Sequence, residues 1–131
     1  MKPHLLQTAS ALQFPVFVGG ENYNGNPDPM RTPVLRRLVM EHFAKLGAQL
    51  PHAVFIPLGP VPTKVMEVLI KDGCFRKDQV LSGLPHPSGA NAERIQYFLG
   101  RKNSSQLSVK TNPTLLDSAR SRLQGQVSQL I

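Results

Sequence analysis

Apolar residues along the chain fall into two kinds of pattern. In some stretches they are consecutive and bounded by glycine or proline, which predicts short strands over 14–18, 53–59 and 79–82. In others they recur every three or four residues, which predicts helices over 33–46, 60–71, 91–100 and 114–130. This alternation of strands and helices is typical of an α/β fold with a mainly parallel sheet and right-handed crossovers.

Local signals refine several of these elements. Thr32 and Pro33 predict a helix start, with a capping hydroxyl followed by proline at the first helical position. Gly47 is expected to end that helix, and His42 on its apolar face is interpreted as a histidine at the edge of the core. The run 53–59 contains no polar residue, so we expect a strand that is buried on both faces.

The segment after the third predicted strand is a stiff turn that leads into a helix. Pro85 and Pro87 flank His86, and each proline fixes its own φ and keeps the preceding residue out of a helix. Ser88 and Asn91 are each expected to cap the helix that follows. His86 is therefore expected near a helix N-terminus, facing a developing anion or a phosphate. The alternative interpretation is an ordinary turn with an ordinary cap.

In a parallel sheet, the loops that follow the strands meet at one edge, where ligands bind. Such an edge would gather polar side chains suited to a planar or anionic ligand, namely Asn22, Tyr23, Asn24, Arg31, His86, Ser88 and Asn91. No serine-nucleophile elbow and no glycine-rich phosphate loop occurs. The histidines lack metal-ligand spacing, so we expect no metal and no cofactor. Only Glu21 and Asp28 are expected near this edge, so a general base is poorly supplied.

Composition and charge indicate the class of binding partner and the cellular compartment. Lys and Arg exceed Asp and Glu by seven and the pI is near 10.1, which favours a polyanionic partner, nucleic acid first, over a merely basic soluble protein. The length predicts a single domain over 1–131, with a core at about 14–101 and a C-terminal helix at about 114–130. The lone Cys74 favours a reducing compartment. Without a signal peptide or a membrane-spanning apolar run, the protein is expected to be cytoplasmic.

Two stretches are similar to a known family. Leu84–Ser88, after a strand and before a helix, resembles the second motif of the uracil-DNA glycosylase superfamily, which is typically His-Pro-Ser. Val54–Gly59 is similar to the preceding core strand, and the wider similarity covers 14–101. The resemblance implies a three-layer α/β sandwich with a mainly parallel sheet. It also implies an enzyme of base-excision DNA repair that flips a damaged base into a pocket and hydrolyses its N-glycosidic bond.

The same resemblance implies roles for individual residues. His86 would donate a hydrogen bond to the carbonyl oxygen of the departing uracil anion, an oxyanion-type role. Three residues would hold a DNA phosphate or lie against the DNA, namely Ser88, Gly89 and Asn91. The residue that reads the base would be Asn22 or Asn24.

One expected motif has no counterpart. The first motif of the family, a Gly-x-x-Pro sequence after its first strand, does not occur before Phe14, although Gly25–Pro29 is superficially similar. The resemblance therefore predicts a domain truncated at its N-terminus, with unpaired sheet edges that invite association. Three hypotheses stay open: a glycosylase, an inactive DNA-binding remnant, and a small α/β interaction or ligand-binding protein. The oligomeric state is not specified by the sequence.

Overall fold

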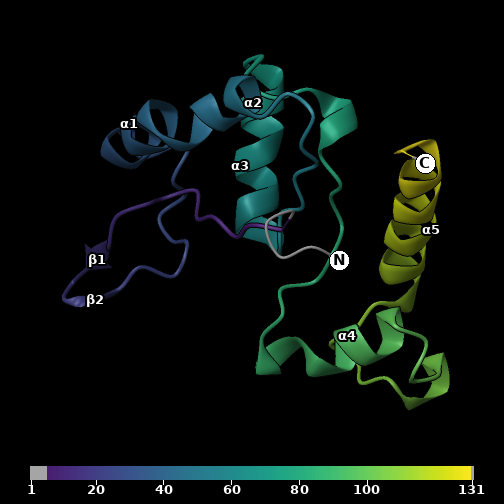
Figure 1. Ribbon diagram of the computed structural model, residues 1–131. Helices are drawn as coiled ribbons and strands as arrows, with labels where there is room; N and C mark the ends of the chain where they lie inside the picture. Colours follow the sequence, from purple (N-terminus) through teal and green to yellow (C-terminus); the bar gives the residue numbers. More distant parts are fainter. Residues whose placement is uncertain (1–5, 131) are drawn as a thin grey trace.

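Helices dominate the computed structural model, which describes residues 6–130 (Figure 1). The elements in chain order, with 3₁₀ helices labelled η, are β1 (Phe17–Val18), β2 (Glu21–Asn22), α1 (Pro33–Glu41), η2 (Phe43–Lys45), α2 (Leu46–Gln49), α3 (Pro60–Lys71), η3 (Lys77–Gln79), η4 (Gly89–Asn91), α4 (Ala92–Phe98), η5 (Ser104–Gln106) and α5 (Pro113–Leu130). Within this part of the chain, no helix combines the length and the apolar character needed to cross a membrane.

The expected three-layer sandwich with a mainly parallel sheet is wrong. Within residues 6–130 the sheet consists of β1 and β2 alone, which pair antiparallel. Gly19 and Gly20 connect them with φ values of 60° and 82°, a conformation that glycine adopts without strain. The strand expected over 14–18 is therefore shorter than predicted, and its partner comes from a segment expected to be a loop.

The two segments expected to form the central strands, 53–59 and 79–82, do lie side by side. They meet in parallel through two isolated bridges, Phe55 with Val80 and Leu58 with Leu84. Between the bridges the register slips by one residue, from a separation of 25 positions to one of 26. Pro57 lies in this interval and has no N–H to donate to a ladder. The slip leaves one extra residue on the 80–84 side, where Gly83 has φ of 121°. Pro57 and this extra residue together interrupt the ladder.

Burial of the 53–59 segment also differs from expectation. Phe55 packs against the core, whereas Val54 and Ile56 are 40% and 49% exposed. Successive side chains of an extended segment point to opposite faces. At this segment one face meets the core and the other remains largely uncovered, so the continuous apolar run is buried on one face only.

The hydrophobic core is built mainly by α1, η2, α3 and the chain around Phe75 and Val80. Its buried residues are Met30, Val39, Phe43, Ala44, Val65, Met66, Leu69, Phe75 and Val80. The Phe75 ring stacks on Phe43 at 5.6 Å and meets Phe55 edge-on at 4.9 Å between ring centroids. In α1 the buried residues are Leu35 and Val39, and in α3 they are Val65, Met66 and Leu69, all of which fall at the helical spacing found in the sequence.

The first helix starts as predicted but ends earlier. α1 begins at Pro33, and the Thr32 hydroxyl donates to the Asp28 carbonyl oxygen (2.8 Å) rather than capping the helix. The helix ends at Glu41, and Gly47 lies inside α2 instead of ending a longer helix. A Cβ at Gly47 would lie 2.0 Å from the Cys74 carbonyl oxygen. Gly47 is therefore required by the close approach of two chain segments.

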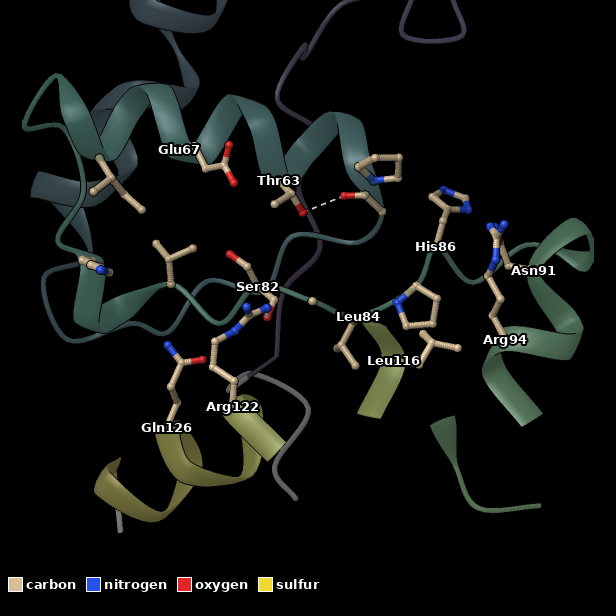
Figure 2. A pocket seen from close by; sticks show the side chains of 17 residues that line it. Thr63, Glu67, Ser82, Leu84, His86, Asn91, Arg94, Leu116, Arg122 and Gln126 are labelled. Atoms are coloured by element: carbon tan, nitrogen blue, oxygen red, sulfur yellow. Dashed lines mark hydrogen bonds between the residues drawn. The ribbon is translucent and has the colours of Figure 1, made fainter. Parts of the chain in front are cut away.

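The C-terminal helices have little share in the core. α4 has no buried residue, and α5 buries only Ala119 and Leu123. Figure 2 shows α3 and α5 on opposite sides of Ser82. At Gly83 (φ 121°) a Cβ would lie 3.1 Å from the Ala119 Cβ. The missing side chain of Gly83 is thus what allows α5 to approach this segment.

Candidate functional site

A cleft of about 580 Å³ is bordered by α3, by the extended chain that follows η3, and by the C-terminal helices (Figure 2). Its lining residues are Gly59, Pro60, Thr63, Glu67, Ile70, Lys77, Val80, Ser82, Gly83, Leu84, Pro85, His86, Asn91, Arg94, Leu116, Arg122 and Gln126. The cleft brings together residues that are up to 67 positions apart, from Gly59 to Gln126. It is the place where the packed core and the C-terminal helices meet.

His86 lies at one end of this cleft, beside the first turn of α3. Gly59, with φ of 92°, is the residue before α3, and a Cβ there would lie 3.0 Å from the His86 Cβ. The absence of a side chain at Gly59 therefore lets the histidine pack against the helix start. The His86 side chain is exposed, and its ring has no hydrogen-bond partner among residues 6–130. The imidazole is available to a ligand in the cleft.

The turn that carries His86 is held by a short chain of polar contacts. The Ser88 N–H donates to the His86 carbonyl oxygen (2.8 Å), and the Asn91 amide donates to the Ser88 hydroxyl oxygen (2.9 Å). Arg94 donates to the Asn91 Oδ1 (2.7 Å) and to the Lys110 carbonyl oxygen (3.1 Å). These contacts connect the His86 turn to α4 and to the loop before α5.

The two residues expected to cap the helix take the predicted positions without making the predicted bonds. Ser88 precedes η4 and Asn91 precedes α4, but neither side chain accepts a backbone N–H. Their side chains bond to each other and to Arg94 instead. The expectation of two side-chain caps is therefore wrong, because competing side-chain partners lie within reach.

Positive charge predominates around the cleft. Lys77, Arg94 and Arg122 line it, and Glu67 is the one carboxylate among the lining residues. Arg122 donates to the Ser82 carbonyl oxygen (3.1 Å), and none of the ion pairs found among residues 6–130 involves Arg94 or Arg122. Because the acceptors of these two guanidinium groups are neutral, no carboxylate offsets their positive charge, and each group retains further N–H donors for an anionic ligand.

The remaining predicted site residues lie outside this cleft. Ser88 touches it only through Asn91, and Gly89 does not line it. Asn22 is exposed in β2, and Asn24 accepts a hydrogen bond from the Asn26 N–H (3.1 Å). Their loop does approach the first turn of α3, since a Cβ at Gly25 would lie 2.7 Å from a Val61 methyl group. The structure therefore brings His86 and Asn91 together and leaves both candidate base readers apart from them.

The other two polar residues of the expected rim have separate surroundings. Arg31 lines a second cleft of about 410 Å³ together with Asp28 and Lys64. The Tyr23 hydroxyl donates to the Pro27 carbonyl oxygen. Burial and, to a lesser degree, the Asp28 carboxylate raise the pKa of Tyr23, so its phenol stays protonated.

Sequence reasoning missed several residues of the cleft. Thr63, Glu67 and Ile70 line it because residues four and seven positions apart share one face of α3. That spacing was a usable signal for their grouping. Arg122 and Gln126 are grouped in the same way on α5, but nothing in the sequence indicates that this face would lie opposite α3.

Comparison with known proteins gives one informative match. The chain is 35% identical over 118 residues to a protein of Bacillus subtilis (strain 168) described as the uncharacterized protein YoxB. The match covers 88% of this chain and 46% of YoxB, so the chain spans about half the length of the curated relative it matches. No family model matches the chain, and no solved structure matches it.

Proposed function

We propose that this protein binds DNA through the cleft beside His86. A damaged base of this DNA would lie against His86. Its N-glycosidic bond would then be hydrolysed, as it is by uracil-DNA glycosylases. One observation carries the proposal: an open cleft holds an exposed imidazole together with three cations and one carboxylate. The resemblance of Leu84–Ser88 to the motif of that superfamily supports it independently.

Charge distribution supports DNA as the ligand. Residues 89–130 contain six Lys or Arg and two acidic residues, which gives this stretch a net charge of +4. Both acidic residues are already engaged, Glu93 by Ser108 and Thr111 and Asp117 by Tyr97. Cations that face a phosphate backbone supply most of the affinity of non-specific DNA binding by releasing counterions. The C-terminal side of the cleft is therefore the proposed phosphate-binding side.

The proposed chemistry requires stabilisation of a leaving group. Water attacks the C1′ atom of the deoxyribose, the bond from C1′ to the base nitrogen breaks, and the electron pair leaves with the base. A hydrogen bond from His86 to the carbonyl oxygen of that anion would lower the barrier. Glu67 is the cleft carboxylate that could accept the proton of the attacking water. Free uracil and an abasic site with a hydroxyl group at C1′ are the expected products.

The binding step can be tested by fluorescence anisotropy with labelled duplex and single-stranded DNA at several salt concentrations. Replacing Arg94 or Arg122 by Gln is expected to weaken binding to any sequence and to reduce the slope of log affinity against log salt by about one each. Arg37→Gln is the matched control, since Arg37 is exposed on α1 and pairs with Glu41. Equal effects at all three positions, or binding that is insensitive to salt, would contradict the proposed interface.

The excision step needs a separate assay. Release of uracil from uracil-containing DNA is expected for the parent chain and is expected to fall by about 10² to 10³ in His86→Ala, the usual effect of losing one oxyanion donor. His52→Ala is the control, because His52 is exposed and lies outside the cleft. Salt-sensitive binding without any uracil release would favour an inactive DNA-binding protein, the second candidate function.

A further inference from the structure

Among residues 6–130, the segment 53–58 forms backbone hydrogen bonds along one edge and none along the other. The Phe55 N–H donates to the Gln79 carbonyl oxygen (2.7 Å), and the Leu81 N–H donates to the Phe55 carbonyl oxygen (2.9 Å). Residues along an extended chain direct their backbone groups alternately to the two edges. The backbone N–H and C=O groups of Val54, Ile56 and Leu58 therefore point away from 79–84, and no backbone hydrogen bond from residues 6–130 reaches them. The bridge between Leu58 and Leu84 is made through the neighbouring Gly59 N–H.

This unused edge is apolar and has a complete set of donors. Val54, Ile56 and Leu58 are 40%, 49% and 39% exposed. Pro57 has no N–H, but it lies two positions after Phe55, so its backbone points to the same edge as that of Phe55, toward 79–84. The missing donor is therefore not on the edge of Val54, Ile56 and Leu58. The ten residues 53–62 contain no charged side chain. Exposed edges of this kind are normally blocked by charge, by proline or by a covering segment.

The edge is complementary to itself. In an antiparallel pair centred on Ile56, two copies would exchange hydrogen bonds between their Ile56 residues, and Val54 of each copy would lie opposite Leu58 of the other. No like charges would face each other, and β-branched or aliphatic side chains would meet across the pair. A two-fold axis requires such a self-complementary patch.

We propose that residues 54–58 pair with the same residues of a second copy of this chain and form a dimer. The neutrality of 53–62 favours a second copy over an acidic partner, since the chain carries a net charge of +7 elsewhere. Because that charge makes the two copies repel each other, added salt strengthens the dimer. DNA binding at the cleft has the opposite dependence on salt, so the two associations are separable.

The test is sedimentation equilibrium or light scattering over a range of protein concentrations, with two substitutions at the centre of the edge. Ile56→Lys places two cations against each other at the two-fold axis, and Ile56→Pro removes the central donor without adding charge. Both are expected to be monomeric at concentrations where the parent chain is dimeric. Because Ile56 is half exposed, circular dichroism is expected to show an unchanged fold.

Val109→Lys is the matched control, since Val109 is fully exposed and lies far along the chain from the edge. The same loss of apolar surface and the same added charge there are expected to leave the dimer intact. A parent chain that stays monomeric overturns the proposal, and a strand of another protein would then be the remaining candidate to pair with this edge. A dimer that persists in both Ile56 variants, or one that Val109→Lys also dissociates, overturns it as well.

Discussion

The packed core and the C-terminal helices are held by different kinds of contact. The core cluster falls within residues 30–80 and consists entirely of hydrophobic side chains, with Val39 and Leu69 completely buried. In the C-terminal helices, α4 buries nothing, and its position depends on Glu93 and Tyr97, which bond to Ser108, Thr111 and Asp117. Hydrophobic burial is worth more than partly exposed polar contacts, so the two regions should differ in local stability.

The difference bears on the proposed site. The C-terminal side contributes Arg94 and Arg122, and the His86 turn contacts both sides, the core side at Gly59 and the C-terminal side through Asn91. A cleft between a stable wall and a less stable wall can change its width at small cost in free energy. The proposed phosphate-binding residues Arg94 and Arg122 therefore lie on the less stable wall, and the His86 turn lies between the two walls.

The largest expected difference in the free energy of unfolding comes from truncating one leucine side chain to alanine in each region. Leu69→Ala is expected to lower the free energy of unfolding by about 2 to 5 kcal/mol, because it leaves a cavity among close-packed neighbours. Leu123→Ala in α5 is expected to lower the free energy of unfolding by about 2 kcal/mol at most, because few core residues surround Leu123. Urea denaturation followed by circular dichroism measures both. Equal losses would show that α5 is packed as tightly as the core.

Replacing one glycine in each region by alanine is expected to change the free energy of unfolding by an intermediate amount, with opposite signs in the two regions. Gly47→Ala in α2 is expected to destabilise the protein by about 1 to 3 kcal/mol through its clash with the Cys74 carbonyl oxygen. Gly125→Ala in α5 meets nothing within 4 Å and is expected to stabilise by up to about 1 kcal/mol through helix propensity. Thermal unfolding of both variants tests this. A stabilising Gly47→Ala would contradict the close approach of the two segments.

The smallest effect concerns the polar anchor of α4. The hydrogen bond from the Thr111 hydroxyl, followed by those from Ser108, lowers the pKa of Glu93 from 4.5 to about 2. Since the folded pKa is the lower one, the contribution of Glu93 to stability is present above pH 4.5 and is lost as the pH falls through about 2. The Ser108 amide signal in NMR spectra should follow this titration, while core amides such as that of Leu69 should not.

Two variants check this assignment. Glu93→Gln is expected to abolish the titration of the Ser108 amide, because no carboxylate remains to accept its hydrogen bond. Glu21→Gln, at an exposed position in β2, is expected to leave the titration unchanged. A Ser108 signal that titrates normally in Glu93→Gln would assign the transition to another group.

Helix positions were largely predictable from sequence, and the sheet was not. α3 and α5 fill the expected ranges because helical spacing and proline at the first position are local signals. Pro57 was visible in the sequence, but its consequence depended on which segment would lie beside it. Gly47 was interpreted as a helix stop because the approach of Cys74 is a contact between distant residues.

The candidate site shows the same division. The Pro85–Pro87 turn and the helix after it follow from local chemistry, and the resemblance of this segment to a glycosylase motif rests on the same neighbouring residues. The grouping of Asn22 and Asn24 with His86 assumed a continuous parallel sheet, and without that sheet they do not line the cleft.

The sequence by itself determined the ranges of α3 and α5, the start of α1, the stiff turn at His86 and the excess of positive charge. Each follows from residues that are neighbours along the chain or from a simple count. Only the tertiary structure decided that Glu67, Arg94 and Arg122 border the His86 cleft and that α5 packs on Gly83. It also decided that one edge of 53–58 has no backbone hydrogen bond from the part of the chain that the structure describes. These features depend on which distant segments meet, and that is set by packing and backbone hydrogen bonding throughout the molecule.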